Sequence, residues 1–164
     1  MLIRFRWSAV IFSLLYGLLA VFVVIPYLRF NEVLQWDAVG HFFSAWNIRE
    51  NLWPSPTGWS PFFFAGFPQG TFYPPLFHWL VATLSFVVPL SFAFKLIVIA
   101  SVLSTPWAVY RFTRAYGLAP FSASAAMVVT TALLIAPITY SSGNNNVGGT
   151  LISTFHIGLV VNAF

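Results

Sequence analysis

Residues 7–28 read WSAVIFSLLYGLLAVFVVIPYL, an uncharged run of 22 residues that follows Arg4 and Arg6 and precedes Arg29. A helix of this length measures about 33 Å at 1.5 Å per residue, enough to cross a hydrocarbon core of about 30 Å. A secretory signal has an apolar segment of roughly 7–15 residues and ends at small residues, whereas this run ends in IPYL. We therefore expect residues 7–28 to form an uncleaved membrane helix.

The composition also predicts an integral membrane protein. Apolar residues make up 59% of the 164 positions and charged residues only 6%, with a mean hydropathy of +0.85, whereas a soluble domain carries about 25% charged residues. The net charge of +4 comes from seven basic residues against three acidic ones. The basic residues are too scattered to form a stripe, so nucleic acid is not expected as a partner. No cysteine occurs, which excludes disulfides and thiolate metal sites.

Four further apolar stretches follow, at residues 76–90, 92–112, 119–139 and 151–164. The first has 15 residues and is bounded by prolines, so that as a helix it would measure about 22 Å, less than a full crossing. The last stops after 14 residues and predicts only the start of a fourth membrane helix. We expect an all-α polytopic membrane chain of about four crossings, and an N-terminal fragment of a longer protein.

Two arrangements of these stretches are possible. If all five cross the membrane, Arg111 and Arg114 lie on the side opposite Arg4 and Arg6. If residues 76–90 lie along the interface instead, all four arginines are cytoplasmic, as the excess of basic residues in cytoplasmic loops predicts. We favour the second arrangement. It places the N-terminus in the cytoplasm and makes residues 29–91 and 140–150 external loops of a plasma membrane protein.

The long external loop has two parts. Residues 37–51 have helical spacing, with Asp37, His41 and Glu50 at more polar positions, which predicts an amphipathic helix on the membrane surface. Its apolar face is expected to hold Val39, Phe42, Phe43, Trp46 and Ile48. Residues 52–75 read LWPSPTGWSPFFFAGFPQGTFYPP, whose six prolines argue against a regular helix. We expect a structured, aromatic-walled loop at the interface.

Asp37 and His41 are the main candidates for chemistry. They are four residues apart, so a helix projects both from one face. Together they could hold a divalent cation such as Mg²⁺ or Mn²⁺, or His41 could orient the carboxylate as a base. The alternative is that Asp37 only caps the helix, since aspartate is a preferred N-cap residue.

Five other residues are weaker candidates for substrate binding. The rings of Trp59 and Tyr73 could stack on a sugar or a lipid, although an interfacial aromatic belt is the commoner reason for such residues. His78 could bind a ligand or be a hydrogen-bonded core residue. The amides of Asn144 and Asn145 could bind a sugar or merely connect two helices. No P-loop, GxGxxG, HExxH, GxSxG or CxxC motif supports nucleotide hydrolysis or zinc peptidase chemistry.

The order of several motifs is more specific than any one of them. The chain runs from WDAVGH (36–41) and IRENL (48–52) through GFPQG (66–70) and YPPLFH (73–78) to YRFTRAYGL (110–118). This order resembles the N-terminal part of the C-type (GT-C) membrane glycosyltransferases, among them the oligosaccharyltransferase catalytic subunits and the protein mannosyltransferases. It is also similar to bacterial and archaeal membrane proteins labelled as related to 6-pyruvoyl-tetrahydropterin synthase, which share G-x-P followed by Y-P-P-L.

The resemblance implies transfer of a hexosyl or pentosyl group from a polyprenyl-phosphate donor on the non-cytoplasmic face. It implies that Asp37 is the essential acid, acting as a base or holding a divalent metal, that His41 matches a histidine that often follows, and that the PPL stretch is a juxtamembrane helix. One departure is that residues 140–150 lack the second acid that many members place in this loop. The alternative is therefore a non-catalytic membrane module that binds lipid-linked glycan or a partner membrane subunit.

Overall fold

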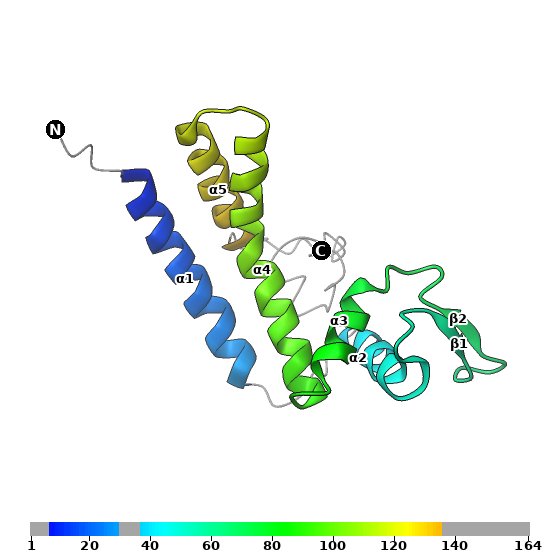
Figure 1. Ribbon diagram of the computed structural model, residues 1–164. Helices are drawn as coiled ribbons and strands as arrows, with labels where there is room; N and C mark the ends of the chain where they lie inside the picture. The colour runs from blue at the N-terminus through cyan, green and yellow to red at the C-terminus, as the bar shows by residue number, and fades with distance from the viewer. Residues whose placement is uncertain (1–6, 30–36, 136–164) are drawn as a thin grey trace, which may run out of the picture.

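The computed structural model describes residues 7–29 and 37–135 and is mostly helical (Figure 1). In chain order the elements are α1 (Trp7–Arg29), α2 (Asp37–Asn47), the π-helical turn η1 (Ile48–Leu52), β1 (Gly58–Ser60), β2 (Phe67–Gln69), α3 (Leu76–Leu84), α4 (Leu90–Ala115) and α5 (Pro120–Ile135). The two short strands form a hairpin. The prediction of a mostly helical chain is therefore confirmed, and the two short strands lie in the segment 52–75, where a structured loop and no regular helix was expected.

Three long helices make one half of the molecule. α1 and α5 both contact α4, and α5 runs back along α4 after a short turn (Figure 1). In the part of the chain that the structure describes, α4 is the helix that is both long and apolar enough to cross a membrane, and α5 is apolar but shorter. The predicted stretch 92–112 lies within α4, and residues 119–135 of the predicted third crossing include α5. Residues 136–139 and the predicted fourth crossing at 151–164 lie outside the described residues.

The stretch at residues 76–90 forms only a short helix. α3 has nine residues, about 14 Å, which is less than half of a hydrocarbon core. Pro75 precedes α3, and Pro89 is the N-cap of α4, with the extended backbone that a residue before a helix adopts. The prolines that suggested a short element in the sequence therefore mark the boundaries of α3 and α4.

A small apolar core joins α2 and α3 to the first turns of α4. Its two large rings are Phe77 of α3 and Phe94 of α4, which meet edge to face with centroids 5.2 Å apart. Phe42 of α2 packs against Phe94 at 6.0 Å. Small residues, Ala45 among them, let α2 approach these rings closely. This core fixes the surface helices to the end of α4 and so positions the site described below.

The buried face of α2 differs from the predicted one. His41, expected at a polar position, is buried, while Val39, expected on the apolar face, is 46% exposed. Phe43 and Trp46 are only partly buried. Spacing can locate one apolar stripe, but in a chain this rich in rings it cannot tell a ring that packs on protein from a ring that stays exposed.

The hairpin is fixed to α2 by side-chain amides. The strands pair antiparallel with Trp59 opposite Pro68. Gln69 of β2 accepts a hydrogen bond from the Asn47 amide at 2.6 Å and donates one to the Ser44 carbonyl at 2.8 Å. At the other end of the loop, the Trp79 indole donates to the Pro54 carbonyl at 3.0 Å. These long-range contacts hold a proline-rich segment in one conformation.

Gly66 closes the hairpin loop in a conformation that only glycine adopts easily. Its φ is +87°, and a Cβ there would lie 2.6 Å from both the Ser60 carbonyl oxygen and Trp59 Nε1. We expect Gly66→Ala to destabilise the fold by about 2 kcal/mol, because the left-handed backbone and the overlap both oppose the methyl group. Thermal unfolding in detergent, followed by circular dichroism, measures this. Gly17→Ala is the control, because a Cβ on that glycine of α1 meets nothing within 4 Å; equal losses in both variants would contradict the prediction.

Candidate functional site

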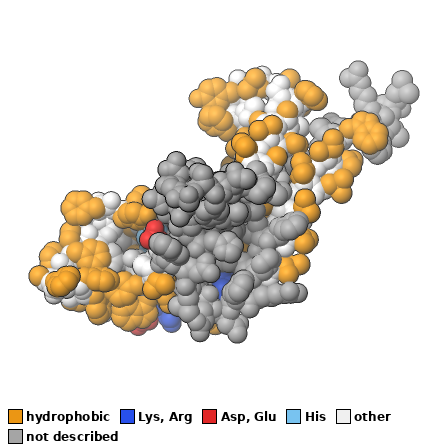
Figure 2. Space-filling view, turned by 180° about the vertical axis from the view of Figure 1, so that it is seen from behind, with side chains coloured by type: hydrophobic (Ala, Val, Ile, Leu, Met, Phe, Trp, Pro, Cys, Tyr) orange, Lys and Arg blue, Asp and Glu red, His pale blue; other side chains and the backbone are white. Residues whose placement is uncertain are grey.

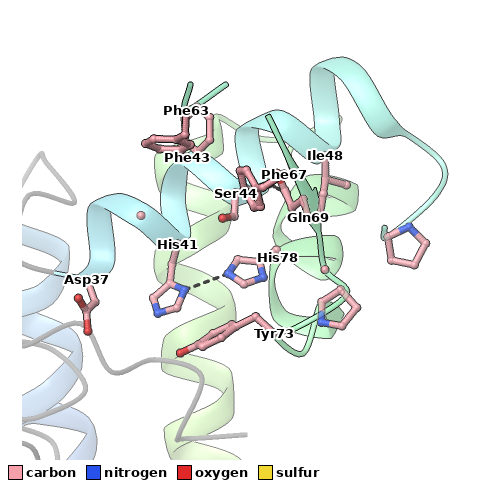
Figure 3. Close-up of a pocket in the computed structure, with 14 residues that line it drawn as sticks. Asp37, His41, Phe43, Ser44, Ile48, Phe63, Phe67, Gln69, Tyr73 and His78 are labelled. Atoms are coloured by element: carbon pink, nitrogen blue, oxygen red, sulfur yellow. Dashed lines mark hydrogen bonds between the residues drawn. The ribbon is translucent and has the colours of Figure 1, made fainter. Parts of the chain in front are cut away.

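A pocket of about 500 Å³ lies between α2, the hairpin and the segment that leads into α3 (Figure 3). α2 contributes Asp37, His41 and Ser44, and α3 contributes His78. The hairpin and the following loop contribute a set of rings and one amide: Phe63, Phe67, Gln69 and Tyr73. The pocket therefore combines a carboxylate and two imidazoles with an aromatic wall.

Asp37 lies at the start of α2, in its first turn. The positive end of the helix dipole favours a carboxylate there. Because α2 begins at Asp37 itself, the residue preceding the helix is residue 36, which lies outside the described part of the chain. Asp37 lines the pocket from this position, as the prediction of a functional acid requires. The helix start thus explains its placement, and the pocket gives its carboxylate access to a ligand.

His41 and His78 form a buried pair. His41 Nδ1 and His78 Nε2 are 3.0 Å apart, so one of the two nitrogens donates a hydrogen bond and the other accepts it. The rings are stacked with centroids 5.2 Å apart, and the Tyr73 ring lies 5.6 Å from His41. Figure 3 shows Asp37 on the side of His41 opposite His78. The hydrogen bond to His78 therefore uses Nδ1 of His41, and Nε2 of His41 can bind a partner in the pocket.

Burial keeps both imidazoles uncharged at neutral pH. Burial, together with a smaller effect of the nearby His41, lowers the pKa of His78 to about 4. Burial also lowers the pKa of His41, an effect that the Asp37 carboxylate opposes. Among the described residues that line the pocket, Asp37 is therefore the one with a formal charge near pH 7.

These pKa values make the stability of the fold dependent on pH. The pKa of His78 is about 4 in the folded chain and 6.5 without burial, so between these values the unfolded chain binds more protons. The free energy of unfolding should fall by about 3 kcal/mol as the pH drops from 7 to 4, since one pKa unit corresponds to about 1.4 kcal/mol. Chemical unfolding in detergent across this range measures the slope. His78→Gln should flatten it, and an unchanged slope in that variant would contradict the assignment.

The other predicted site residues have different positions. Tyr73 and His78 line the pocket, whereas Trp59 is 61% exposed on β1 and does not line it. Asn144 and Asn145 lie outside the described residues. Within residues 7–29 and 37–135 no group of three or more histidine, aspartate or glutamate side chains is arranged to hold a metal. Among the described residues, Asp37 and His41 are the two predicted metal ligands that line the pocket.

Sequence reasoning missed several residues of the site. Ser44 carries no signal of its own, and the pairing of His41 with His78 joins residues 37 positions apart. Gln69 lies in the GFPQG motif, which gave the one available hint. Its amide is already bonded at both ends, to Asn47 and to the Ser44 carbonyl. Gln69 therefore positions the hairpin wall.

Comparison of the chain with family models, with curated proteins and with solved structures finds no match.

Proposed function

We propose that this chain belongs to a polytopic membrane glycosyltransferase of the GT-C type. It would transfer a hexosyl or pentosyl group from a polyprenyl-phosphate donor, with Asp37 as the essential carboxylate. The observation that carries the proposal is the position of Asp37 in the first turn of α2, where it lines a pocket walled by two neutral imidazoles and several rings. The resemblance of the motif order to that superfamily supports the same role.

The membrane location is supported by the surfaces of the long helices. α4 has the length and hydropathy of a crossing helix. α1 has 23 residues, and its single charged residue is Arg29 at the end. Large apolar side chains of α1 are exposed along its length: Trp7, Val10, Ile11, Leu14, Leu18, Val21, Ile25 and Leu28. An apolar surface of this extent is favourable in lipid and costly in water, which supports a membrane location for α1. The proposal of a multi-pass protein of the plasma membrane with a cytoplasmic N-terminus rests on the apolar stretches of the sequence and on the distribution of its arginines.

The chemistry follows from the carboxylate. A hydroxyl acceptor is a weak nucleophile, and a carboxylate within hydrogen-bonding distance can accept its proton as attack begins. The acceptor oxygen then bonds to the anomeric carbon of the sugar, while the bond from that carbon to the phosphate oxygen breaks and the lipid phosphate leaves. The neutral rings of Tyr73 and Phe67 offer faces on which a sugar can stack, and the hydroxyl of Ser44 offers a hydrogen bond.

A divalent cation, Mg²⁺ or Mn²⁺, fits this pocket when substrate phosphate completes its coordination. Asp37 would hold the ion through an oxygen, and His41 Nε2 is the nearest imidazole nitrogen left free by the histidine pair. Such ions commonly bind through one or two carboxylates together with substrate phosphates. A bound cation would neutralise charge on the leaving phosphate.

One observation favours the alternative function. Asp37 is the one carboxylate among the described residues that line the pocket, whereas paired acids are common in the superfamily that the sequence resembles. A non-catalytic module could use the same pocket to bind a lipid-linked glycan, or could pack on a partner membrane subunit.

The two functions can be separated on the full-length protein reconstituted into vesicles. A polyprenyl-phosphate donor with a radiolabelled sugar is supplied together with a hydroxyl acceptor. The glycosyltransferase proposal expects label in the acceptor and release of polyprenyl phosphate. Retention of the intact donor by the protein, with no transfer to any acceptor tested, would favour the binding module. If the protein neither retains the donor nor transfers its sugar, both proposed functions are contradicted.

A further inference from the structure

The tip of the hairpin carries a cluster of exposed rings. Residues 61–66 read PFFFAG, and the chain presents Phe63 and Phe64 there together with Trp59 of β1. The side chain of Phe64 is fully exposed, at 108% of its reference area. Figure 2 shows hydrophobic side chains gathered over the end of the molecule that carries the hairpin. In water this arrangement would expose apolar surface without compensation.

The backbone holds these rings outward in a strained conformation. Phe63 has a φ of 63° and Phe64 a φ of 57°. Bulky residues adopt this left-handed region at a cost of about 1–2 kcal/mol each, and glycine or asparagine is favoured there. A loop that served only to reverse the chain would be more stable with those residues. Phenylalanine at both positions therefore points to a use for these side chains.

The surroundings of the tip fit lipid better than a charged partner. From residue 51 to residue 94 the chain contains no lysine, arginine, aspartate or glutamate. Figure 1 shows the hairpin beyond α2 and α3, at the height of the lower part of α4, where that helix begins. If α1 and α4 cross the membrane, this level corresponds to the boundary between headgroups and acyl chains, where aromatic rings are enriched.

We propose that the hairpin tip, with Phe64 foremost, inserts into the headgroup–acyl boundary of the outer leaflet. This inference rests on the membrane location proposed above for α1 and α4. Phe63 belongs to the same tip, packs on Phe43 at 5.3 Å and lines the pocket. Insertion of the tip therefore brings the aromatic wall of the pocket to the lipid surface, and a lipid-linked substrate can reach Asp37 without leaving the bilayer.

Spin labels test the insertion, because residues 1–164 contain no cysteine. Once any cysteine elsewhere in the full-length protein is replaced by alanine, a single introduced cysteine is labelled uniquely. The full-length protein with Phe64→Cys is reconstituted into phosphatidylcholine vesicles, and its collisions with oxygen and with a water-soluble nickel chelate are compared. Ala100→Cys on the exposed surface of α4 reports the membrane location, and Glu50→Cys on η1 reports the aqueous side. Ala65→Cys reports on the same tip should the label at position 64 impair folding.

If the tip is inserted, the labels at positions 64 and 100 collide more often with oxygen than with the nickel chelate. The label at position 50 collides more often with the nickel chelate. Nickel access at 64 equal to that at 50, with 100 still in lipid, would overturn the insertion and leave the membrane location standing. A label at 64 reached by neither reagent would indicate that protein covers the tip, and it would also overturn the proposal. Nickel access at 100 would overturn the membrane location and the insertion together.

Discussion

Replacement of Asp37 by asparagine is expected to lower sugar transfer by the full-length protein about 10²–10⁴-fold, the usual contribution of a general base. Asparagine has nearly the same shape and is also tolerated at helix starts, so α2 and the pocket should keep their structure. The amide cannot accept a proton at neutral pH and is a poorer ligand for a hard cation. The measurement is the initial rate of transfer from a radiolabelled polyprenyl-phosphate donor in vesicles.

Glu50→Gln is the matched control for this variant. Glu50 is an exposed acid on η1 whose carboxylate lies 3.5 Å from Arg49 Nε, and it does not line the pocket. Its rate should equal that of the unmodified protein. The cation dependence separates the two roles of Asp37: if it holds a metal, the asparagine variant needs more Mg²⁺ or Mn²⁺, and if it is a base, the variant loses activity at every cation concentration. Equal rates in both variants would remove Asp37 from the chemistry.

Phe94→Ala is expected to give the largest loss of stability, about 3–5 kcal/mol, as large aromatic truncations in cores do. The Phe94 side chain is fully buried, and its ring lies against Phe77 and Phe42, so the substitution leaves a cavity where α2, α3 and α4 meet. Because this core holds the surface helices on α4, the pocket should be lost with it. Unfolding in mixed detergent micelles, followed by circular dichroism, measures the change.

Phe112→Ala provides the comparison in the same helix. Its ring is 64% exposed near the other end of α4, so truncation should change the free energy of unfolding by less than about 0.5 kcal/mol. Loss of stability in Phe112→Ala as large as in Phe94→Ala would mean that the ring cluster around Phe77 does not dominate the packing.

The positions of helices and of their boundaries could be predicted, because they depend on residues that are close together in the sequence. Long apolar runs located the helices that became α1 and α4, and the prolines at positions 75 and 89 marked a short helix between them. The start of the surface helix at Asp37 followed from the same local pattern. Each of these features follows from length, charge and proline chemistry within about one helix length, which one sequence contains in full.

The features that could not be predicted depend on contacts between residues that are far apart in the sequence. The hairpin requires residues 58–60 to pair with residues 67–69 and is fixed by a bond from Asn47 to Gln69, 22 positions away. The burial of His41 depends on His78, which α3 supplies. Trp59 was a candidate for substrate binding because aromatic residues bind sugars, but it is exposed on β1 and does not line the pocket. Ring content alone cannot distinguish a pocket wall from an exposed tip.

The histidine pair has a consequence for how the pocket handles protons. The hydrogen between His41 Nδ1 and His78 Nε2 can belong to only one ring at a time, so the tautomers of both rings must change together. When that hydrogen belongs to His41, its Nε2 presents a lone pair to the pocket. When it belongs to His78, the same Nε2 presents an N–H group. One atom beside Asp37 can thus alternate between accepting and donating while the pair remains electrically neutral.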